Sequence, residues 1–371
     1  MLPELRPFPQ RFTYRYIVVN KSRRGRQRNA ITQPMKKLFA LILWTAALAP
    51  LTAQSQQQPG TLAGFLSGQG LVGAKLERRF ENHLFVPVAI NSKRAALMID
   101  TGAPVTIIDK NSAGTFGLKV ENTTINVGRI FGMRWERYGV SVAKSIAMGN
   151  CVVTNVPVAL ADTSDMNPDA PAPAIGTHIT TVNRLPHLNG LLGVREMSKF
   201  GMIIDCARQM LYINPNGPSA EVSQKLAGLL SDRGFTRIAM RRNSTNHLEV
   251  ASVLNGHPTR MIVDTGAAVT TVDRTMASQA GVGIAGTRFV EDAGEGRIER
   301  LGTGEVNELK IGDYTIPRAT VSVVNVSGTM LHSKSAEESN SGLIGAEYLA
   351  WNFAVIDVGD MALYLRHPDS R

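Results

Sequence analysis

The sequence predicts a mostly β protein made of two similar lobes with a few short helices. Two stretches carry this prediction, ALMIDTGAPVTIID at 96–109 and RMIVDTGAAVTTVD at 260–273. In each, an apolar run typical of a buried strand ends in an acid, and a Thr-Gly turn leads into a second apolar run. The 34 glycines also favour a turn-rich β protein over a helical bundle. With 371 residues, the chain is long enough for two domains with cores of their own.

The two stretches belong to a longer internal repeat. When Asp100 is placed on Asp264, the tripeptide Asn-His-Leu at 82–84 falls on the same tripeptide at 246–248 without a gap. A second pair of blocks, GLLGVREMSKFGMIIDCARQMLYI and GLIGAEYLAWNFAVIDVGDMALYL, begins at Gly190 and at Gly342. We therefore expect a tandem duplication.

The repeat divides the chain into expected domains. Lobe 1 is expected at 73–215, lobe 2 at 235–371, and a helical connector between them at 216–234. Ser219 can cap the start of this helix and Gly234 can end it. The apolar residues of the connector form one stripe at helical spacing: Val222, Leu226, Leu229 and Leu230.

Several polar residues recur in both copies. Asp109 and Asp273 stand where a short helix is expected to begin, so we interpret them as N-caps. Short helices are also expected after Gly193 and Gly345.

Two further polar pairs recur. His83 and His247 lie near the starts of expected strands, where local hydrogen bonding is the predicted role. For Asp205 and Asp357, in the later block of each copy, we expect structural polar roles.

The N-terminal segments carry the basic charge of the chain. Residues 1–37 hold ten of the Lys and Arg residues and one Glu, which leaves about +1 of the net +10 for the rest. The body shows no basic patch with interleaved aromatics, so nucleic-acid binding is not expected.

MKKLFALILWTAALAPLTAQS, from Met35, has the cationic head, the apolar run and the small residues of a secretory signal peptide. We therefore expect residues 1–34 to be a non-native or disordered extension, 35–53 a signal peptide, and 54–72 a flexible linker. The mature protein would then be periplasmic or secreted. The alternative is an uncut segment that tethers the protein to the membrane.

No cofactor or metal is expected from the sequence. The seven histidines are scattered and no metal-ligand spacing is present. GVGIAG at 281–286 matches a dinucleotide-binding glycine pattern, but it follows an expected helix rather than a strand. Cys151 and Cys206 could pair in an exported chain or could both be free and buried.

The two repeated acids suggest a definite chemistry. An acid at the end of an apolar run is costly to bury unless it is paired, and its counterpart in the other lobe is the simplest partner. Two carboxylates in contact share one proton, so one can take a proton from water while the other donates a hydrogen bond to a substrate carbonyl. Asp100 and Asp264 are therefore the candidate catalytic residues. The hydroxyls of Thr101 and Thr265 can fix the turns.

The glycines that follow allow the two turns to approach closely. Gly102 and Gly266 have no side chain, so their backbones can present N–H groups to the carboxylates.

These motifs resemble those of retropepsin-like (retroviral-type) aspartic proteases and, more distantly, of pepsin-like enzymes. The resemblance rests on Asp-Thr-Gly-Ala in both copies, which adds Ala103 and Ala267 to the dyad support, and on Leu-Leu-Gly at 191–193 and Leu-Ile-Gly at 343–345. It implies two acid-protease β-barrel lobes related by a pseudo-two-fold, with the apolar-apolar-Gly segment behind each turn.

The resemblance also implies a glycine-rich flap over the substrate in each lobe. Its candidates are residues 126–140, with Gly132 and Trp135, and residues 291–306, with Gly294 and Gly296. An extended peptide would bind between flap and dyad. In one respect the first copy departs from the family: Val-Arg-Glu at 194–196 stands where an apolar-acid-aromatic run is usual.

The leading interpretation is an exported aspartic endopeptidase that acts on peptides or proteins, with its active site formed within one chain. Retropepsins usually carry one domain per chain and dimerise, whereas this chain carries both halves. One alternative is that each lobe pairs with the same lobe of another chain. The other is a non-catalytic peptide-binding or scaffold module of the cell envelope.

Overall fold

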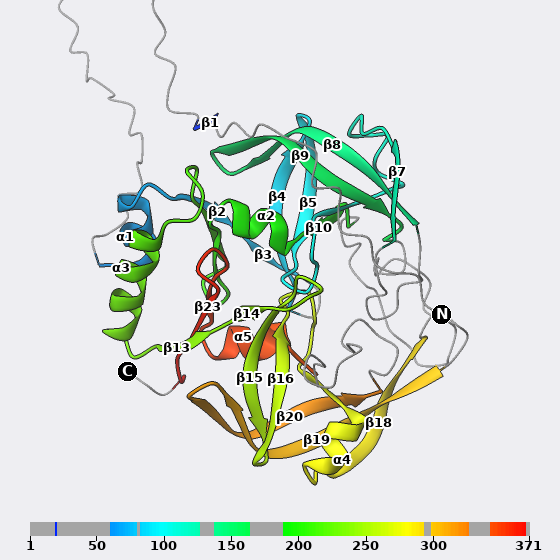
Figure 1. Ribbon diagram of the computed structural model, residues 1–371, viewed down its shortest axis with the longest axis vertical. Helices are drawn as coiled ribbons and strands as arrows, with labels where there is room; N and C mark the ends of the chain where they lie inside the picture. The colour runs from blue at the N-terminus through cyan, green and yellow to red at the C-terminus, as the bar shows by residue number, and fades with distance from the viewer. Residues whose placement is uncertain are drawn as a thin grey trace, which may run out of the picture.

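The computed structural model describes residues 19–20, 60–79, 82–126, 137–163, 188–292, 298–325 and 342–368. It is mostly β, and Figure 1 shows the two lobes one above the other, with a third group of strands between them. This confirms the predicted fold class.

Lobe 1 is a closed barrel of six strands. Around the barrel, the order is β4, β5, β10, β6, β9 and β8, and β8 pairs with β4 to close it. The β5–β10 and β6–β9 pairs are parallel and the other pairs are antiparallel. The barrel strands are β4 Leu84–Ile90, β5 Lys93–Ile99, β6 Ile107–Asp109, β8 Arg137–Met148, β9 Cys151–Ala161 and β10 Gly190–Leu192, with β3 Glu77–Arg78 and β7 Glu121–Asn126 at its margins.

Lobe 2 repeats this arrangement strand for strand. The order around its barrel is β15, β16, β21, β17, β20 and β19, and β19 pairs with β15 to close it. Its strands are β15 Leu248–Leu254, β16 His257–Val263, β17 Thr271–Asp273, β19 Ile298–Ile311, β20 Tyr314–Val324 and β21 Gly342–Ile344, with β14 Arg241–Arg242 and β18 Ile284–Asp292 at its margins.

Burial changes along the strands that lead to the acids. On β4 buried residues alternate with more exposed ones, as expected for a strand with one face on the core. On β5, the basic start Lys93 and Arg94 is exposed, and the last four residues before Asp100 are all buried. β16 follows the same course and ends in three buried residues before Asp264. Each apolar run therefore carries its acid from the surface to the interior.

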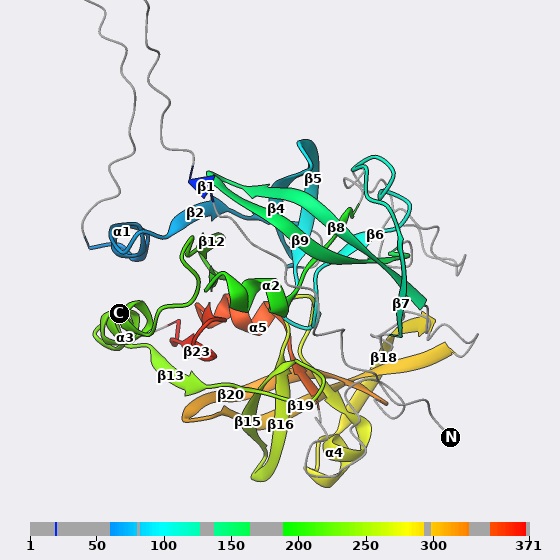
Figure 2. The same ribbon diagram turned by 45° about the horizontal axis from the view of Figure 1, so that its top comes forward.

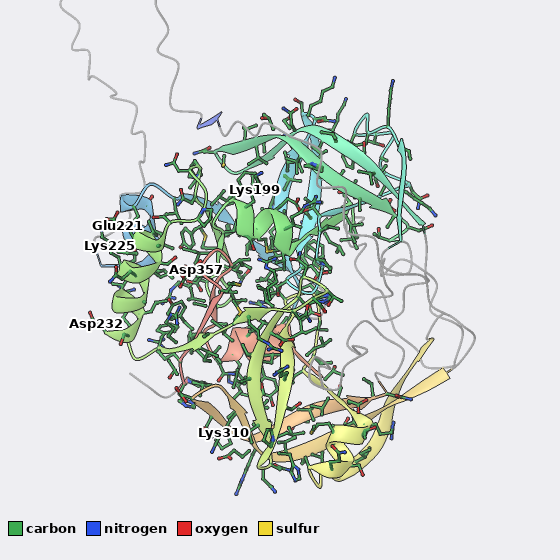
Figure 3. All side chains as sticks on the ribbon, viewed as in Figure 1. Lys199, Glu221, Lys225, Asp232, Lys310 and Asp357 are labelled. Carbon is green, nitrogen blue, oxygen red and sulfur yellow. The ribbon has the colours of Figure 1, made fainter. Side chains whose placement is uncertain are left out.

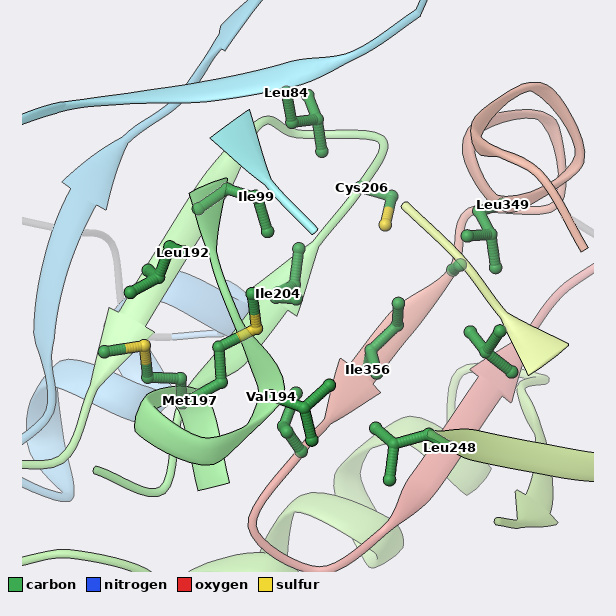
Figure 4. Packing of buried hydrophobic residues seen from close by; sticks show 14 of the residues in the cluster. Leu84, Ile99, Leu192, Val194, Met197, Ile204, Cys206, Leu248, Leu349 and Ile356 are labelled. Carbon is green, nitrogen blue, oxygen red and sulfur yellow. The ribbon is translucent and has the colours of Figure 1, made fainter. Parts of the chain in front are cut away.

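A six-stranded sheet joins the lobes. Its order is β13 Thr236–Ala239, β23 Ala362–Leu365, β22 Val355–Asp357, β11 Ile203–Asp205, β12 Met210–Ile213 and β2 Val72–Lys75. At its centre β11 of lobe 1 pairs antiparallel with β22 of lobe 2, and Ile204 lies opposite Ile356. Figure 4 shows both side chains in the same buried cluster as Leu192 and Leu248.

Helices cover both faces of this sheet. Alternate residues such as Ile204 and Ile356 face α2 Val194–Lys199 and α5 Ala346–Trp351, which lie next to each other between the lobes in Figure 2. The intervening residues, such as Ile203 and Val355, pack in a second cluster with α1 Leu62–Gly68 and α3 Ala220–Ser231. The lobes thus share one continuous core, and the boundary between them is buried.

The predicted connector helix is confirmed as α3. The Ser219 hydroxyl accepts a hydrogen bond from the Val222 N–H (3.4 Å), and the predicted apolar stripe packs in the second cluster. On its buried side the Ser223 hydroxyl donates to Asp357 (2.7 Å), while on its exposed side Lys225 and Glu221 form an ion pair (2.7 Å; Figure 3).

Other helix predictions had mixed outcomes. The helices after Gly193 and Gly345 are confirmed as α2 and α5, and Asp273 caps α4 Arg274–Gln279 as expected. The helix predicted after Asp109 is wrong: residues 110–117 form turns, and Asp109 accepts from the Ser112 N–H (2.9 Å). That stretch, KNSAGTFG, contains two glycines and poor helix formers, which favour turns.

The flexible linker predicted at 54–72 is wrong in its second half, because residues 62–68 form α1. Thr61 caps this helix by accepting from the Gly64 N–H (3.0 Å), and Leu62 and Leu66 are buried. The expected disordered extension at 1–34 also contains β1 Val19–Asn20, which pairs with Cys151 and Val152 at an otherwise open edge of β9.

The expected signal peptide at 35–53 lies outside the described residues. Within the described part of the chain, no helix has the length and apolar character needed to cross a membrane. Cys151 and Cys206 are both free and buried, so the pairing left open by the sequence does not form in this structure.

Candidate active site

The two acids occupy equivalent places at the ends of β5 and β16. The Asp100 N–H donates to the Leu192 carbonyl (3.1 Å), and the Asp264 N–H donates to the Ile344 carbonyl (3.0 Å). Beside them β10 pairs with β5 and β21 pairs with β16, both in parallel. The apolar-apolar-Gly segment therefore runs directly beside each acid-bearing strand, as expected.

Glycine is required where this segment leaves the acid. A Cβ on Gly193 would lie 2.8 Å from the Thr106 backbone nitrogen, and one on Gly345 would lie 2.7 Å from that of Thr270. Both distances are shorter than a real Cβ contact. The two glycines thus allow the chain that follows β10 and β21 to pack against the chain that follows each turn.

The carboxyls of Asp100 and Asp264 meet across the lobe boundary. They are 4% and 9% exposed, and their side chains are hydrogen bonded to each other. Each also lies over the glycine of the opposite turn. A Cβ on Gly102 would sit 2.5 Å from Asp264 Cγ, and one on Gly266 would sit 2.5 Å from Asp100 Cγ. Only glycine leaves room for this approach.

Backbone amides of the turns point at the carboxyls. The Gly102 N–H donates to Asp100 Oδ1 (2.8 Å), and the Gly266 N–H donates to Asp264 Oδ1 (2.8 Å). The Ala267 N–H also donates to Asp264 Oδ1 (3.1 Å). These amides are the donors expected from the turn geometry, and they stabilise negative charge in the pair.

The two threonines tie the turns together. The Thr101 N–H donates to the Thr265 hydroxyl (3.1 Å), and the Thr265 N–H donates to the Thr101 hydroxyl (3.0 Å). Each hydroxyl donates in turn to the opposite lobe, Thr101 to the Val263 carbonyl (2.6 Å) and Thr265 to the Ile99 carbonyl (2.7 Å). Four buried hydrogen bonds thereby hold the bases of the two acid-bearing turns together.

A sequence comparison agrees with this geometry. The profile of the aspartyl protease family matches residues 86–194 and 250–348, one region in each lobe. The chain belongs to the aspartyl protease family. Comparison with curated proteins gave no match.

Three solved structures were compared with the chain. An aspartic proteinase from Irpex lacteus is 11% identical, with 81% of this chain and 98% of that chain covered and a TM-score of 0.46. A retropepsin-like aspartic protease from Rickettsia conorii is 18% identical, with 36% and 91% covered and a TM-score of 0.25. Basic 7S globulin from soybean is 9% identical, with 80% and 94% covered and a TM-score of 0.43.

The electrostatics of the two acids differ. Burial is the largest cause that raises the pKa of Asp100 well above its ordinary value, and repulsion from Asp264 adds to it. Burial also raises the pKa of Asp264, but two backbone N–H groups, the side chain of Asp100 and the charge of His83 act in the opposite direction. The pair therefore favours a single shared proton, which resides more readily on Asp100.

The recurring histidines have a role that the sequence did not predict. His83 Nε2 lies 3.0 Å from the Gly266 carbonyl oxygen, and the buried His247 lies beside the backbone of Gly102. The predicted local hydrogen bonding is confirmed for His247, whose Nδ1 lies 2.7 Å from the Thr245 hydroxyl, but each histidine also reaches the acid-bearing turn of the other lobe. The equal spacing of Asn-His-Leu from both acids was the signal that could have found them.

The difference from the family pattern at 194–196 does not remove the glutamate that contacts the chain after the turn. Glu196 stands one position later than Glu347 in the repeat, yet its Oε2 accepts from the Thr106 N–H (2.9 Å), as Glu347 accepts from the Thr270 N–H. Arg195 occupies the position equivalent to Glu347 and pairs with Glu196. Both lobes therefore hold the chain after their turn with one glutamate, which is buried in lobe 1 and half-buried in lobe 2.

The predicted flaps are described only in part. β7 pairs antiparallel with β8 and β18 pairs antiparallel with β19 on either side of the undescribed parts of these segments, and the flaps stay predictions. Gly132, Trp135, Gly294 and Gly296 lie outside the described residues. Over the described ranges, no group of three or more His, Cys, Asp or Glu residues is placed to hold a metal ion.

Proposed function

We propose that this protein is an aspartic endopeptidase that hydrolyses peptide bonds with a water molecule activated between Asp100 and Asp264. The observation that carries the proposal is the hydrogen-bonded contact of the two buried carboxyls across the lobe boundary. A buried acid pair is costly, and neither lobe requires it for its own barrel. The contact also supports an active site formed within one chain.

The proposed reaction uses one proton shared by the pair. Charged Asp264 takes a proton from the bound water, and neutral Asp100 donates its proton to the substrate carbonyl oxygen as the water oxygen attacks the carbon. The resulting diol collapses when one hydroxyl returns its proton to Asp100 and the acid at Asp264 protonates the departing nitrogen. The carbon–nitrogen bond breaks, and the pair returns with one proton.

Two structural features support these different roles of Asp264 and Asp100. Asp264 Oδ1 accepts hydrogen bonds from Gly266 and Ala267, which stabilise its charged form. Burial, the largest cause, and repulsion by this charge raise the pKa of Asp100 and so favour its protonated form. The substrate is proposed to be an extended peptide or protein segment held between the dyad and the hairpins β7–β8 and β18–β19 by strand-like hydrogen bonds.

The proposed site of action is outside the cytoplasm. Residues 35–53 have the layout of a secretory signal, so the mature chain is proposed to be periplasmic or secreted. If that segment stays uncut, it tethers the protein to the membrane. N-terminal sequencing of the purified mature chain distinguishes the two.

The test is peptide cleavage by single Asn variants at acidic and neutral pH. Asp100→Asn and Asp264→Asn are each expected to lose cleavage of a peptide library by about 1,000-fold or more, because either change removes one of the two proton-handling groups. Asp273→Asn, which changes the N-cap of α4 and leaves both acids of the pair in place, is the matched control and is expected to keep full activity.

Other outcomes separate the alternatives. Substantial activity in both single variants, or activity that rises with the square of protein concentration, contradicts the intramolecular dyad and favours pairing between chains. Tight peptide binding without cleavage over a wide pH range, by the unaltered protein, contradicts the enzyme and favours a binding module.

A further inference from the structure

The repeated tripeptide Asn-His-Leu adopts the same geometry in both lobes. Asn82 and Asn246 both have a left-handed backbone with φ of 71°, which few residues other than Gly and Asn adopt readily. This turn immediately precedes β4 and β15. It places the histidine that follows at the lobe boundary instead of in the barrel of its own lobe.

The contacts of the two histidines are reciprocal. His83 of lobe 1 lies 3.0 Å from the carbonyl oxygen of Gly266 in lobe 2, and His247 of lobe 2 lies beside the backbone of Gly102 in lobe 1. Next to His247, the Asn246 side-chain amide donates to the Pro104 carbonyl (2.9 Å), two residues beyond Gly102. The tripeptide thus contacts the acid-bearing turn of the opposite lobe.

We propose that His83 and His247 are positioning residues of the dyad, each holding the other lobe's Asp-Thr-Gly turn through its glycine carbonyl. This inference rests on the proposed function, because it assigns the histidines to the same site. Neither histidine is proposed to transfer a proton to substrate.

Contacts to the two glycine carbonyls can control the geometry of the acid pair. Gly266 lies directly against the carboxyl of Asp100, and Gly102 against that of Asp264. A small tilt of either glycine peptide would change the gap between the two carboxyls and the direction of the amide that bonds to them. The hydrogen bonds exchanged by Thr101 and Thr265 hold the base of each turn, and the histidines hold its tip. A site of this kind needs such supporting contacts around the residues that carry out the chemistry.

The two histidines differ in their surroundings. His247 is buried, its Nδ1 lies 2.7 Å from the Thr245 hydroxyl, and burial lowers its pKa to about 4. It therefore acts as a neutral donor above that pH. In this neutral state, with Nδ1 accepting from the Thr245 hydroxyl, Nε2 carries the hydrogen and can donate towards the Gly102 backbone.

His83 is half-buried and adds a charge effect. When its ring is protonated, the positive charge acts across the boundary and lowers the pKa of Asp264. Arg79, the neighbouring charged residue on its own segment, is turned to Glu77 and to the ring of Phe85 (5.1 Å). His83 therefore both holds the Gly266 carbonyl and favours the charged form of the acid proposed to activate water.

The test compares Ala and Gln variants of both histidines, since Gln keeps an N–H donor but carries no charge. His83→Ala and His247→Ala are expected to lower kcat about 10- to 100-fold with KM within about twofold, because the substrate contacts are kept while the dyad is misplaced. His83→Gln and His247→Gln are expected to recover most of kcat. His257→Gln and His257→Ala, on the exposed end of the β15–β16 hairpin, are the matched controls and should behave as wild type.

The pH profile separates positioning from stability alone. In His83→Gln the acid limb of kcat/KM is expected to move to higher pH, because the charge that lowers the pKa of Asp264 is gone. His247→Gln should leave that limb in place. The same shift is expected in ¹³C NMR titrations of the Asp264 carboxyl, which require no cleavage and remain informative if the alanine variants fail to fold.

These readouts keep the two proposals apart. If the wild-type protein cleaves no peptide but His83→Gln shifts the Asp264 titration, the proposed function fails and the positioning role stands. If the wild-type protein cleaves peptides while both alanine variants, or both glutamine variants if alanine does not fold, keep wild-type kcat, pH profile and carboxyl titration, the positioning role is overturned.

Discussion

Thr101 and Thr265 exchange hydrogen bonds across the lobe boundary, each donating its N–H to the hydroxyl of the other at 3.1 and 3.0 Å. Because each hydroxyl also donates to a carbonyl behind the opposite acid, the two acid-bearing turns form one hydrogen-bonded unit. The position of either acid therefore depends on both lobes.

Removal of one threonine hydroxyl should destabilise the protein strongly. Thr265→Val keeps the shape of the side chain but leaves the Thr101 N–H and the Ile99 carbonyl buried without a partner. We expect the free energy of unfolding to fall by about 2–4 kcal/mol in urea denaturation, because each buried unsatisfied group costs about 1–3 kcal/mol. Thr265→Ser keeps the hydroxyl and should lose less than half as much. Equal losses in the two variants would contradict the exchange.

A methyl group on the first turn should separate the carboxyls. Gly102→Ala places a Cβ 2.5 Å from Asp264 Cγ, so the turn or the acid must move. We expect cleavage activity to fall by about 100-fold or more, since displacements of about 1 Å have effects of this size. Peptide cleavage and urea denaturation measure the two consequences.

The control for this substitution is Gly228→Ala in α3, where an added Cβ meets no atom within 4 Å. It should keep full activity and stabilise the protein by about 0.5–1 kcal/mol, as alanine favours a helix over glycine. A Gly102→Ala variant as active as this control would show that the turns do not need their close approach.

The buried dyad should make the protein less stable as pH rises. The folded-state pKa of Asp100 lies above its ordinary value of 3.8, so the associated stability is present at low pH and is lost as pH rises through the folded pKa. Asp100→Asn removes this ionisation. At neutral pH the variant should therefore be more stable than wild type, and the advantage should shrink towards about pH 4. Denaturation midpoints that differ equally at both pH values would contradict this.

His247 should give the opposite pH dependence. Its pKa is lowered from 6.5 to about 4 by burial, so the unfolded chain binds the proton first and stability is lost as pH falls between these values. The loss should approach about 3 kcal/mol at pH 4. In His247→Gln this component disappears, and the stability difference from wild type should change with pH over that window. His257→Gln, in the exposed turn, should show no such change.

The acid-bearing elements could be predicted because their signals are local. An apolar run that ends in Asp-Thr-Gly describes a buried strand, its acid and a tight turn within a few residues. The same holds for α3, whose cap and apolar stripe lie within 12 residues. Repetition of the pattern then pointed to the pairing of Asp100 with Asp264, since one buried acid needs a partner.

Errors arose where packing overrode local pattern. The polar segment before lobe 1 looked flexible, yet residues 62–68 form α1 because the sheet that joins the lobes offers an apolar face to Leu62 and Leu66. The turn after Asp109 looked like the capped helix that follows Asp273, but its glycines favour turns.

The sequence by itself determined which residues end buried strands, where the turns lie and that two equivalent acids exist. Only the tertiary structure decided how the halves hold each other. His83 and Gly266 are 183 positions apart, and the Thr101–Thr265 exchange spans 164. Periodicity along the chain reveals that a residue is buried, but the partner that satisfies its polar groups is set by the packing of one lobe against the other.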